Sequence, residues 1–375
     1  MLRDMSCHLP KHPQAFKNAF QFGASPGSHL EFDDIPATFH QRFHFSMEVR
    51  LNSSNGLLFY MANESLGFFF SLFVSSGRFV LLADISGRKL RVRSKEKYHD
   101  GRWHTVFYSR DRSRVQLIIN GLRAQEKSLP VAGDFWIPGP FYVGGAPVEK
   151  AKAHIPDASA TSFKGCIRHL KLDRKPLVSP SRLFGVTPCY EGPLESGTFF
   201  SADGGYVALD RSVAIGQDFE LMLEIRPRSV SGLIFHIGTR QTNYLSLYTD
   251  KEKVTVIANT GAGEFATSVT QPSLCDGQWH TLAVIKSSNV IQLDVDTEGN
   301  YIVGPNQAHA EAIKENFYLG GMPELEDTGL PLAPVAHLPS YIGCMKNLVI
   351  NRNQINLREA GTVRGAVGLT ECPLM

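Results

Sequence analysis

Two short segments, Asp100-Gly-Arg-Trp-His-Thr105 and Asp276-Gly-Gln-Trp-His-Thr281, are copies of one motif that lie 176 residues apart. In each copy an Asp-Gly pair, which favours a tight turn, is followed by bulky and β-branched residues that favour a strand. We therefore expect each motif to be a turn that enters a strand, with Trp103 and Trp279 packed in the core.

The match extends outward from this motif. Phe45-Ser-Met-Glu-Val-Arg-Leu51 resembles Leu221-Met-Leu-Glu-Ile-Arg-Pro227, and Tyr142-Val-Gly-Gly-Ala-Pro147 returns as Tyr318-Leu-Gly-Gly-Met-Pro323. The offset is the same over about 90 residues, which indicates duplication of a whole domain rather than chance similarity of strands. We predict a lead segment at residues 1–14, a first module at residues 15–190 and a second module at residues 191–375.

Apolar and polar residues alternate within each copy. Between residues 43 and 51 every odd-numbered position is apolar and every even-numbered position is polar, the period of a strand with one buried face. Residues 115–119 are followed by Asn120-Gly121, a pair that favours a two-residue hairpin turn. No helical pattern exceeds one or two turns. The sequence therefore predicts an all-β chain of two tandem, jelly-roll-like antiparallel β-sandwiches.

The composition is that of a globular protein. Hydrophobic residues make up 43% and charged residues 20% of the 375 residues, so each half can bury a core. No apolar run approaches the roughly 18 residues of a membrane-spanning helix, and we expect no membrane insertion. The first ten residues lack the apolar core of a signal peptide. The chain is therefore expected to be either intracellular or a piece of a longer secreted protein.

Charge is distributed unevenly between the two copies. Residues 1–190 carry 26 Lys and Arg against 15 Asp and Glu, whereas residues 191–375 carry 12 against 21. The net charges are thus +11 and −9. A basic module beside an acidic one suggests that the first module meets a polyanion. The alternative is that the asymmetry serves only solubility.

The repeat sorts the six cysteines. Four of them occupy equivalent places near the ends of the copies, as the pairs Cys166 with Cys189 and Cys344 with Cys372. Cys7 and Cys275 have no counterpart in the repeat. We expect these two to bond to each other and so to join the lead segment to the second module. The alternative is two buried free thiols.

Three disulfides favour an oxidising compartment and hence a secreted protein. Asn52-Ser-Ser and Asn63-Glu-Ser are N-glycosylation sequons, both in the first copy. No paired Cys-x-x-Cys or His-Glu-x-x-His spacing occurs, and His40 and His44 lie in or beside a strand pattern. We therefore expect no metal site.

The chain carries no motif of a hydrolase, a phosphate-binding loop or a Cys/His dyad. Asp294 and Asp296 share one face of a predicted strand, an arrangement that glycosidases use. The first copy, however, has the apolar residues 117–119 there, followed by a hairpin. We expect that the protein is not an enzyme.

These segments together resemble the laminin G-like module. The Gly-Leu-Leu-Phe-Tyr strand at residues 56–60, the Asp-Gly-x-Trp-His motif, Tyr-Val-Gly-Gly and the terminal cysteine pair carry the resemblance, which covers residues 15 to 373. Two copies with an extra cysteine in front look like the last two modules of a laminin alpha chain, most similar to the alpha-4 and alpha-3 branch. The resemblance implies a concanavalin-like jelly-roll in each module, within a longer alpha chain of a heterotrimer.

The resemblance also implies secretion into the basement membrane and a set of partners. These are heparan sulfate or heparin, sulfatides, and receptors of the dystroglycan, syndecan or integrin type. We expect no cofactor and no nucleic-acid partner. A bridge between the lead segment and the last module also occurs in that family, which favours the Cys7–Cys275 disulfide over free thiols.

A run of cations in the first copy is the candidate binding site. Residues 88–97 contain six basic residues and one acid. Alternate residues of a strand share a face, so Leu90 and Val92 are expected in the core and five cations outside, namely Lys89, Arg91, Arg93, Lys95 and Lys97. Such a row repels itself and favours an external polyanion such as a sulfated glycan. We predict a heparin-binding site of Arg88, Lys89, Arg91, Arg93, Lys95, Lys97 and Arg102, extended by Arg110, Arg112 and Arg114. The alternative is an edge strand protected by charge against aggregation.

Calcium is the other ligand that the resemblance implies, at a rim site with an Asp after the Gly-Leu-Leu-Phe segment. The first copy has Ser65-Leu66-Gly67-Phe68 there and the second has Thr242-Asn243-Tyr244, and neither offers the carboxylate that a hard cation prefers. We expect no tight calcium site in either copy, which weakens the expectation of dystroglycan binding. A third interpretation, a G-like module that binds a small apolar ligand such as a steroid, requires an apolar pocket.

Overall fold

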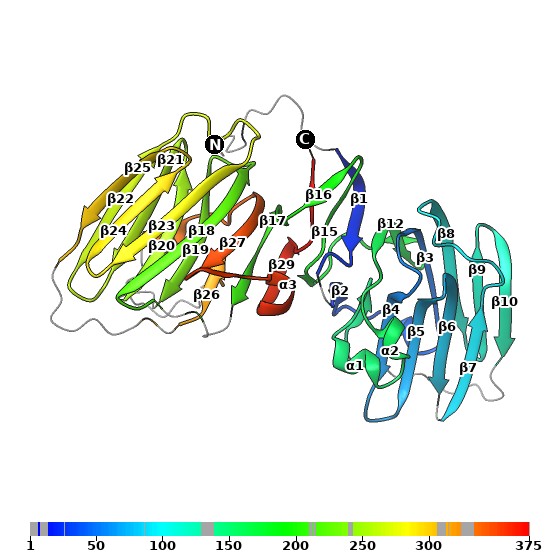
Figure 1. Cartoon of the computed structure of the whole chain (residues 1–375). Helices are drawn as coiled ribbons and strands as arrows, with labels where there is room; N and C mark the ends of the chain where they lie inside the picture. The colour runs from blue at the N-terminus through cyan, green and yellow to red at the C-terminus, as the bar shows by residue number, and fades with distance from the viewer. Residues whose placement is uncertain are drawn as a thin grey trace. The chain divides into compact units, whose positions relative to one another are not determined.

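The computed structural model is built almost entirely of β-strands, as predicted (Figure 1). It describes residue 7 and residues 14–25, 27–85, 87–128, 139–209, 213, 215–238, 243–305, 313, 315–323 and 334–374. The chain divides into two compact units. One is Gln14–Glu191, and the other contains Gly192–Met375 together with Cys7 of the lead segment.

The first module is a sandwich of two antiparallel sheets. The first sheet has the order β10 (Leu122–Ser128), β9 (Arg114–Ile119), β8 (Trp103–Asp111), β3 (Arg42–Leu51), β12 (Gly165–Leu172), β1 (Ala15–Phe22) and β15 (Thr187–Tyr190), with β13 (Lys175–Pro176) paired to β12. The second sheet has the order β14 (Arg182–Phe184), β2 (His29–Phe32), β11 (Phe141–Val143), β4 (Gly56–Asn63), β5 (Phe68–Ser75), β6 (Arg78–Ile85) and β7 (Arg88–Arg93).

The second module repeats this architecture. One sheet contains β28 (Asn353–Gln354), β27 (Gly343–Ile350), β18 (Asp218–Pro227), β23 (His280–Ser287), β24 (Val290–Val295) and β25 (Glu298–Val303). The other contains β29 (Gly361–Gly368), β17 (Thr198–Leu209), β26 (Phe317–Leu319), β19 (Ser231–Gly238), β20 (Tyr244–Asp250), β21 (Lys253–Asn259) and β22 (Glu264–Thr270). A short ladder joins β16 (Leu194–Ser196) to β30 (Glu371–Pro373).

The helical elements are short. They are α1 (Val148–Lys152), α2 (Asp157–Ala160), α3 (Leu357–Ala360) and the 3-10 turns η1 (Ala37–His40) and η2 (Pro334–His337). In the first module, Ala151 of α1 and Ala160 of α2 pack with Tyr60, Phe73 and Val80 on the outer face of the second sheet. No described helix is both long enough and apolar enough to cross a membrane.

Each core follows from strand alternation. In β3 the odd-numbered side chains from Phe43 to Leu51 are at most 1% exposed, while the even-numbered ones reach the outer face. They form one apolar cluster with Leu81 of β6 and Val92 of β7 from the opposite sheet. Burial of a side chain of this size contributes about 1.5–3 kcal/mol, so the register of each strand is strongly specified.

The motif that marks the repeat packs in the opposite sense to the one expected, because its histidine points inward. His104 is 9% exposed and lies 2.8 Å from Asp100, the acid of the turn. Trp103 is half-exposed on the outer face, with the guanidinium carbons of Arg50 and Arg168 at 5.1 and 4.2 Å from its ring centroid. The expectation of core tryptophans is therefore wrong, because alternation along β8 leaves Trp103 on the outer face, where the two cations cover it.

The second copy has the same arrangement. Trp279 is half-exposed, with Arg226 and Lys346 at 4.8 and 4.1 Å from its ring centroid. His280 is buried, and its two ring nitrogens lie 2.8 Å from Asp296 and 3.3 Å from Asp276. The motif thus joins a turn to a strand through a contact between a buried His and the exposed Asp of the turn.

All six cysteines form disulfides. Cys166–Cys189 and Cys344–Cys372 close the modules over 23 and 28 residues, and Cys7–Cys275 attaches the lead segment to the second module with a Cα–Cα distance of 5.2 Å. The backbone N–H of Cys7 also donates to the carbonyl of Arg228 at 3.0 Å.

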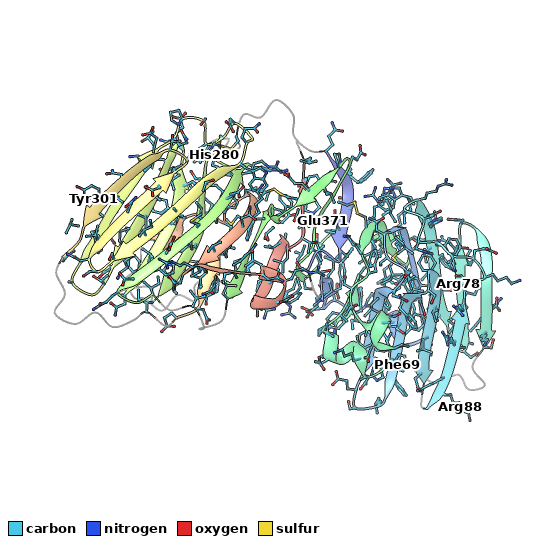
Figure 2. All side chains as sticks on the ribbon, in the orientation of Figure 1. Phe69, Arg78, Arg88, His280, Tyr301 and Glu371 are labelled. Carbon is cyan, nitrogen blue, oxygen red and sulfur yellow. A yellow bond between two sulfur atoms is a disulfide. The ribbon has the colours of Figure 1, made fainter. Side chains whose placement is uncertain are left out.

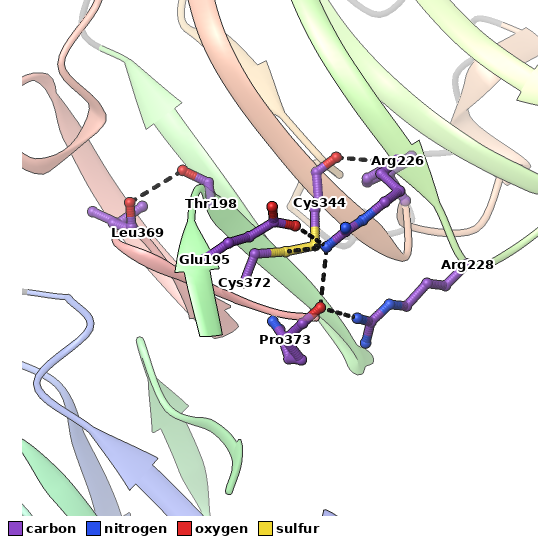
Figure 3. Close-up of a disulfide and its surroundings, with 9 residues drawn as sticks. Glu195, Thr198, Arg226, Arg228, Cys344, Leu369, Cys372 and Pro373 are labelled. Carbon is purple, nitrogen blue, oxygen red and sulfur yellow. Dashed lines mark hydrogen bonds and ion pairs between the residues drawn. A yellow bond between two sulfur atoms is a disulfide. The ribbon is translucent and has the colours of Figure 1, made fainter. Parts of the chain in front are cut away.

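The disulfide near the end of the second module is anchored by arginines (Figure 3). Arg226 and Arg228 both donate to the carbonyl oxygen of Pro373, at 3.0 and 2.7 Å, and Arg226 also pairs with Glu195. These charge-assisted bonds and the ladder of β16 with β30 hold the C-terminal strand against the module.

Peptide mapping under non-reducing conditions is expected to recover three cross-linked peptide pairs, including Cys7 with Cys275. Loss of that bridge in a Cys7→Ser/Cys275→Ser variant should lower the free energy of unfolding of the second module by about 2–5 kcal/mol. Recovery of Cys275 as an alkylated free thiol from the native protein would remove the bridge from the fold.

Replacement of Asp296 by Asn is expected to destabilise the second module in a pH-dependent way. Burial alone would raise the pKa of Asp296, but hydrogen bonds from His280, Thr281 and Gln271 outweigh it and hold the pKa below its ordinary value. A lowered carboxyl pKa stabilises the fold above the ordinary pKa, and this stabilisation is lost as pH falls through the folded-state pKa. We expect a loss of about 1–3 kcal/mol near neutral pH that shrinks below about pH 4, measured by urea unfolding.

The matched control for that experiment is Asp294→Asn. The side chain of Asp294 accepts hydrogen bonds from Gln292 on an exposed face, and its replacement should change stability by no more than about 0.5 kcal/mol. Equal effects of the two substitutions at every pH would contradict the special role of Asp296.

Candidate functional site

Strand β7 carries the predicted cations at the edge of its sheet. It pairs with β6 in the register Lys89 to Asp84, Arg91 to Leu82 and Arg93 to Val80, and no described strand pairs with its other side. The side chains of Lys89, Arg91 and Arg93 are exposed, whereas Leu90 and Val92 are 4% and 0% exposed and belong to the core. Alternation along the strand therefore presents these three cations outward.

The strand ends earlier than expected. The hydroxyl of Ser94 accepts from the N–H of Phe79 at 3.0 Å and donates to the carbonyl of Glu96 at 3.0 Å, which turns the chain after Arg93. Lys95 and Lys97 are exposed but follow this turn, so the prediction of one straight row of five cations is wrong. We call Lys89, Arg91, Arg93, Lys95 and Lys97 together the basic stripe.

One further cation lies beside the basic stripe. Arg78, at the start of β6, is half-exposed on the same outer face, and its Nε donates to the carbonyl of Lys95 at 3.1 Å (Figure 2). Arg88, also predicted, is exposed at the other end of β7. The sequence analysis missed Arg78, because its place beside β7 depends on the pairing of β6 with β7.

The extension of the site toward β8 and β9 does not form. Arg110 is 1% exposed and donates to the carbonyl of His40 at 2.9 Å, and Arg114 pairs with Glu126. Both strands belong to the other sheet, and the side chains of Arg110 and Arg114 are engaged within that part of the module. Arg112 is exposed in the turn between them, and Arg102 is exposed beside the Asp100 turn.

The charges around the basic stripe leave it accessible to an anion from solvent. Among the described residues, no ion pair involves the side chains of Lys89, Arg91, Lys95 or Lys97. The carboxylate registered opposite Lys89 is Asp84, which is 7% exposed. Positive charge at this edge therefore faces solvent, as an anion site requires. The same position also fits the alternative of edge protection.

The other predicted sites differ in their surroundings. In the part of the chain that the structure describes, no group of three His, Cys, Asp or Glu could hold a metal. At the calcium position of the first copy, Asn63 accepts hydrogen bonds from Ser65 and from the N–H of Leu66. In the second copy Asn243 is described but Thr242 lies outside the described residues.

The two acids of the enzyme interpretation do not form a pair. Asp294 lies on β24, but Asp296 lies in the following turn, where it accepts from His280, Thr281 and Gln271. Its carboxylate is therefore engaged in holding the turn, and the expected shared strand face is absent.

The two N-glycosylation sequons differ in the exposure of their asparagines. Asn52 is exposed, whereas Asn63 is 4% exposed and its amide oxygen caps a turn. This contrast favours Asn52 as a glycan acceptor.

A pocket of about 440 Å³ in the second module is one place where a small apolar ligand could bind. Core residues such as Leu223 and Leu319 line it, but six of its fourteen lining residues are polar, including Lys346 and Asn347. The mixed lining of this pocket gives the steroid-type interpretation little support, because such sites are lined predominantly by apolar side chains.

Comparison with known proteins places these features in a family. Residues 49–178 and residues 225–353 each match a model of the laminin G domain. The chain is 40% identical to laminin subunit alpha-4 of Mus musculus over 373 residues and 39% identical to laminin subunit alpha-3 of Homo sapiens over 372 residues. Each alignment covers 99% of this chain, but only 20% and 11% of the respective relative.

A solved structure supports the same family assignment. The LG4-5 domains of the mouse laminin alpha1 chain match with a TM-score of 0.54 and 26% identity, over 98% of this chain and 99% of that one. The chain thus spans a fifth or less of the length of the curated relatives named above. With both halves matched, the chain belongs to the laminin G domain family, as two tandem copies of the domain.

Proposed function

We propose that the chain is the adhesive end of an extracellular-matrix laminin alpha chain, and that its first module binds sulfated glycans through the basic stripe. The observation that carries the proposal is the alternation along β7, where Leu90 and Val92 enter the core while Lys89 and Arg91 extend into solvent with no ion pair among the described residues. Heparan sulfate and sulfatides are the ligand classes that fit.

The physical argument rests on charge spacing. Cations on alternate residues of a strand lie roughly 6.6 Å apart, and a sulfated glycan carries charge along its length at a comparable scale. Binding releases counterions from the glycan, so that affinity falls with salt as it does for other polyanions. Arginine adds paired hydrogen bonds to sulfate or carboxylate oxygens.

The relatives extend the proposal to the whole protein. Laminin alpha chains suggest assembly into a heterotrimer, secretion into the basement membrane and adhesion without catalysis. Three disulfides support an oxidising compartment, and Asn52 is the proposed glycan acceptor. Cell-surface receptors of the dystroglycan, syndecan or integrin type are further partners in this proposal.

Changing Arg91 and Arg93 to Ser is expected to lower the salt concentration at which the protein elutes from heparin. Because two fewer counterions are released, the slope of log affinity against log salt should fall by up to about 2. Stability should change by no more than about 0.5 kcal/mol, because both side chains are on the surface. Leu90→Ala should do the reverse, with a loss of about 2–4 kcal/mol in stability and unchanged elution.

The matched control is Arg112→Ser/Lys175→Ser, which removes the same charge from exposed positions outside the second sheet. It should lower the salt concentration of elution less than Arg91→Ser/Arg93→Ser, the β7 variant, does. If the β7 variant eluted at the native salt concentration, the stripe would serve as edge protection and the glycan site would lie elsewhere.

Neither module is expected to bind calcium tightly. The positions that the family uses hold Ser65 and Asn243 rather than carboxylates, and a hard cation needs several oxygens, preferably charged. Calorimetric titration of the full chain should show no site tighter than about 10⁻⁵ M. A submicromolar site would contradict this expectation and would strengthen the case for a dystroglycan-type receptor.

A further inference from the structure

A second candidate site lies on the opposite outer face of the first module, on the sheet that does not contain β7. There, β3, β8 and the hairpin between β12 and β13 surround a hollow of about 630 Å³. Its six lining residues are Arg42, His44, Ser46, Phe107, Asp173 and Arg174. This volume lies within the range of roughly 300–1,000 Å³ for small-ligand sites.

The floor of the hollow is aromatic because of strand alternation and register. The core takes Phe43 and Phe45 of β3, which leaves His44 and Ser46 facing outward. Pairing with β8 sets Phe107 opposite Ser46, and the rings of His44 and Phe107 stack with centroids 6.0 Å apart and planes 24° apart. Both rings are half-exposed, so they offer an apolar surface to a ligand.

The hairpin turn forms one wall. Asp173 and Arg174 are its two central residues, both with left-handed backbone conformations, at φ values of 47° and 69°. Non-glycine residues adopt this conformation infrequently, and it is typical of a two-residue hairpin turn. The carboxylate of Asp173 accepts from the N–H of His44 at 3.0 Å, and the N–H of Asp173 donates to the carbonyl of His44 at 2.8 Å. The turn is thereby fastened to β3, and it places Arg174 at the hollow.

The charged side chains of the hollow indicate which class of ligand it binds. Arg42 and Arg174 are exposed, and no ion pair involves either of them within the described residues. A guanidinium binds a carboxylate through two parallel hydrogen bonds. The aromatic floor suits the C–H face of a sugar ring, while Ser46 and the remaining oxygen of Asp173 can bond hydroxyl groups. We propose that this hollow binds an acidic sugar, a unit that carries a carboxylate.

The second module provides an internal comparison. The equivalent positions on β18 and β23 carry Asp218, Glu220 and Ala283 in place of Arg42, His44 and Phe107. The equivalent hairpin residue, Arg352, has the same left-handed conformation, but it pairs with Glu220 at 3.8 Å. The fold therefore does not require the cations or the aromatic ring. Their combination in the first module supports a ligand site rather than a structural role.

The experiment measures binding of defined sugars to the full chain by calorimetry and saturation-transfer NMR. The probes are 3′-sialyllactose, an unsulfated heparosan tetrasaccharide that carries glucuronate, and neutral lactose. We expect at least one acidic probe to bind and lactose to bind at least tenfold more weakly. Arg42→Ser/Arg174→Ser should weaken binding of the acidic probe at least tenfold, as should Phe107→Ala, which introduces the residue of the second module. The acidic probe that binds identifies the source of the carboxylate.

Two controls separate this site from others. Arg352→Ser removes the equivalent arginine of the second module and should change affinity less than twofold. Arg91→Ser/Arg93→Ser should also change the affinity for the acidic probe less than twofold. Loss of the basic stripe can then be distinguished from loss of the hollow. Thermal unfolding checks that each variant is folded. The proposal is overturned if neither acidic probe binds, if lactose binds equally well, or if only the β7 variant loses binding.

Discussion

Many strands of these sandwiches contribute every second side chain to the apolar core of their own module, and this constraint governs much of the rest of the molecule. In β3 the inward side chains from Phe43 to Leu51 are at most 1% exposed, and in β7 Leu90 and Val92 enter the same core. A register shift of one residue would bury arginines and expose phenylalanines. Outward residues are less constrained, although some of them, such as Tyr60 and Trp103, pack on the outer face. Both candidate sites consist of such outward residues, and for that reason their chemistry can change without loss of the fold.

The two modules use this freedom differently. In the first, cations occupy the outer faces of both sheets, with Arg91 at the edge of one and Arg42 on the other. In the second, the corresponding face carries Asp218 and exposed apolar side chains such as Met222 and Tyr301. These differences on the outer faces contribute to the net charges of +11 and −9. Anion sites on opposite faces of one module would allow it to engage two acidic chains at once.

The repeated tryptophan shows that not every outward residue is a binding residue. Arg50 covers Trp103 and also donates toward the sulfurs of Cys189 and Cys166, at 3.3 and 3.5 Å. In the second module Arg226 covers Trp279 and donates toward Cys344 at 3.7 Å. A cation over an aromatic face is stabilising by about 0.5–2 kcal/mol. This repeated cluster therefore contacts the disulfide that closes each module, and its arginines are engaged within the protein.

The sequence by itself determined the duplication, the β-strands, the places of the cysteines and the outward direction of Lys89, Arg91 and Arg93, because a period of two and a constant offset are local properties. It did not determine which alternate face of a strand enters the core at the Asp-Gly-x-Trp-His motif, nor that Arg110 is buried. Only the tertiary structure decided that Arg78 lies beside the basic stripe and that Arg42 and Arg174, 132 residues apart, share one hollow. The physical reason is that pairing register between strands depends on the whole sheet, whereas periodicity reports only one strand at a time.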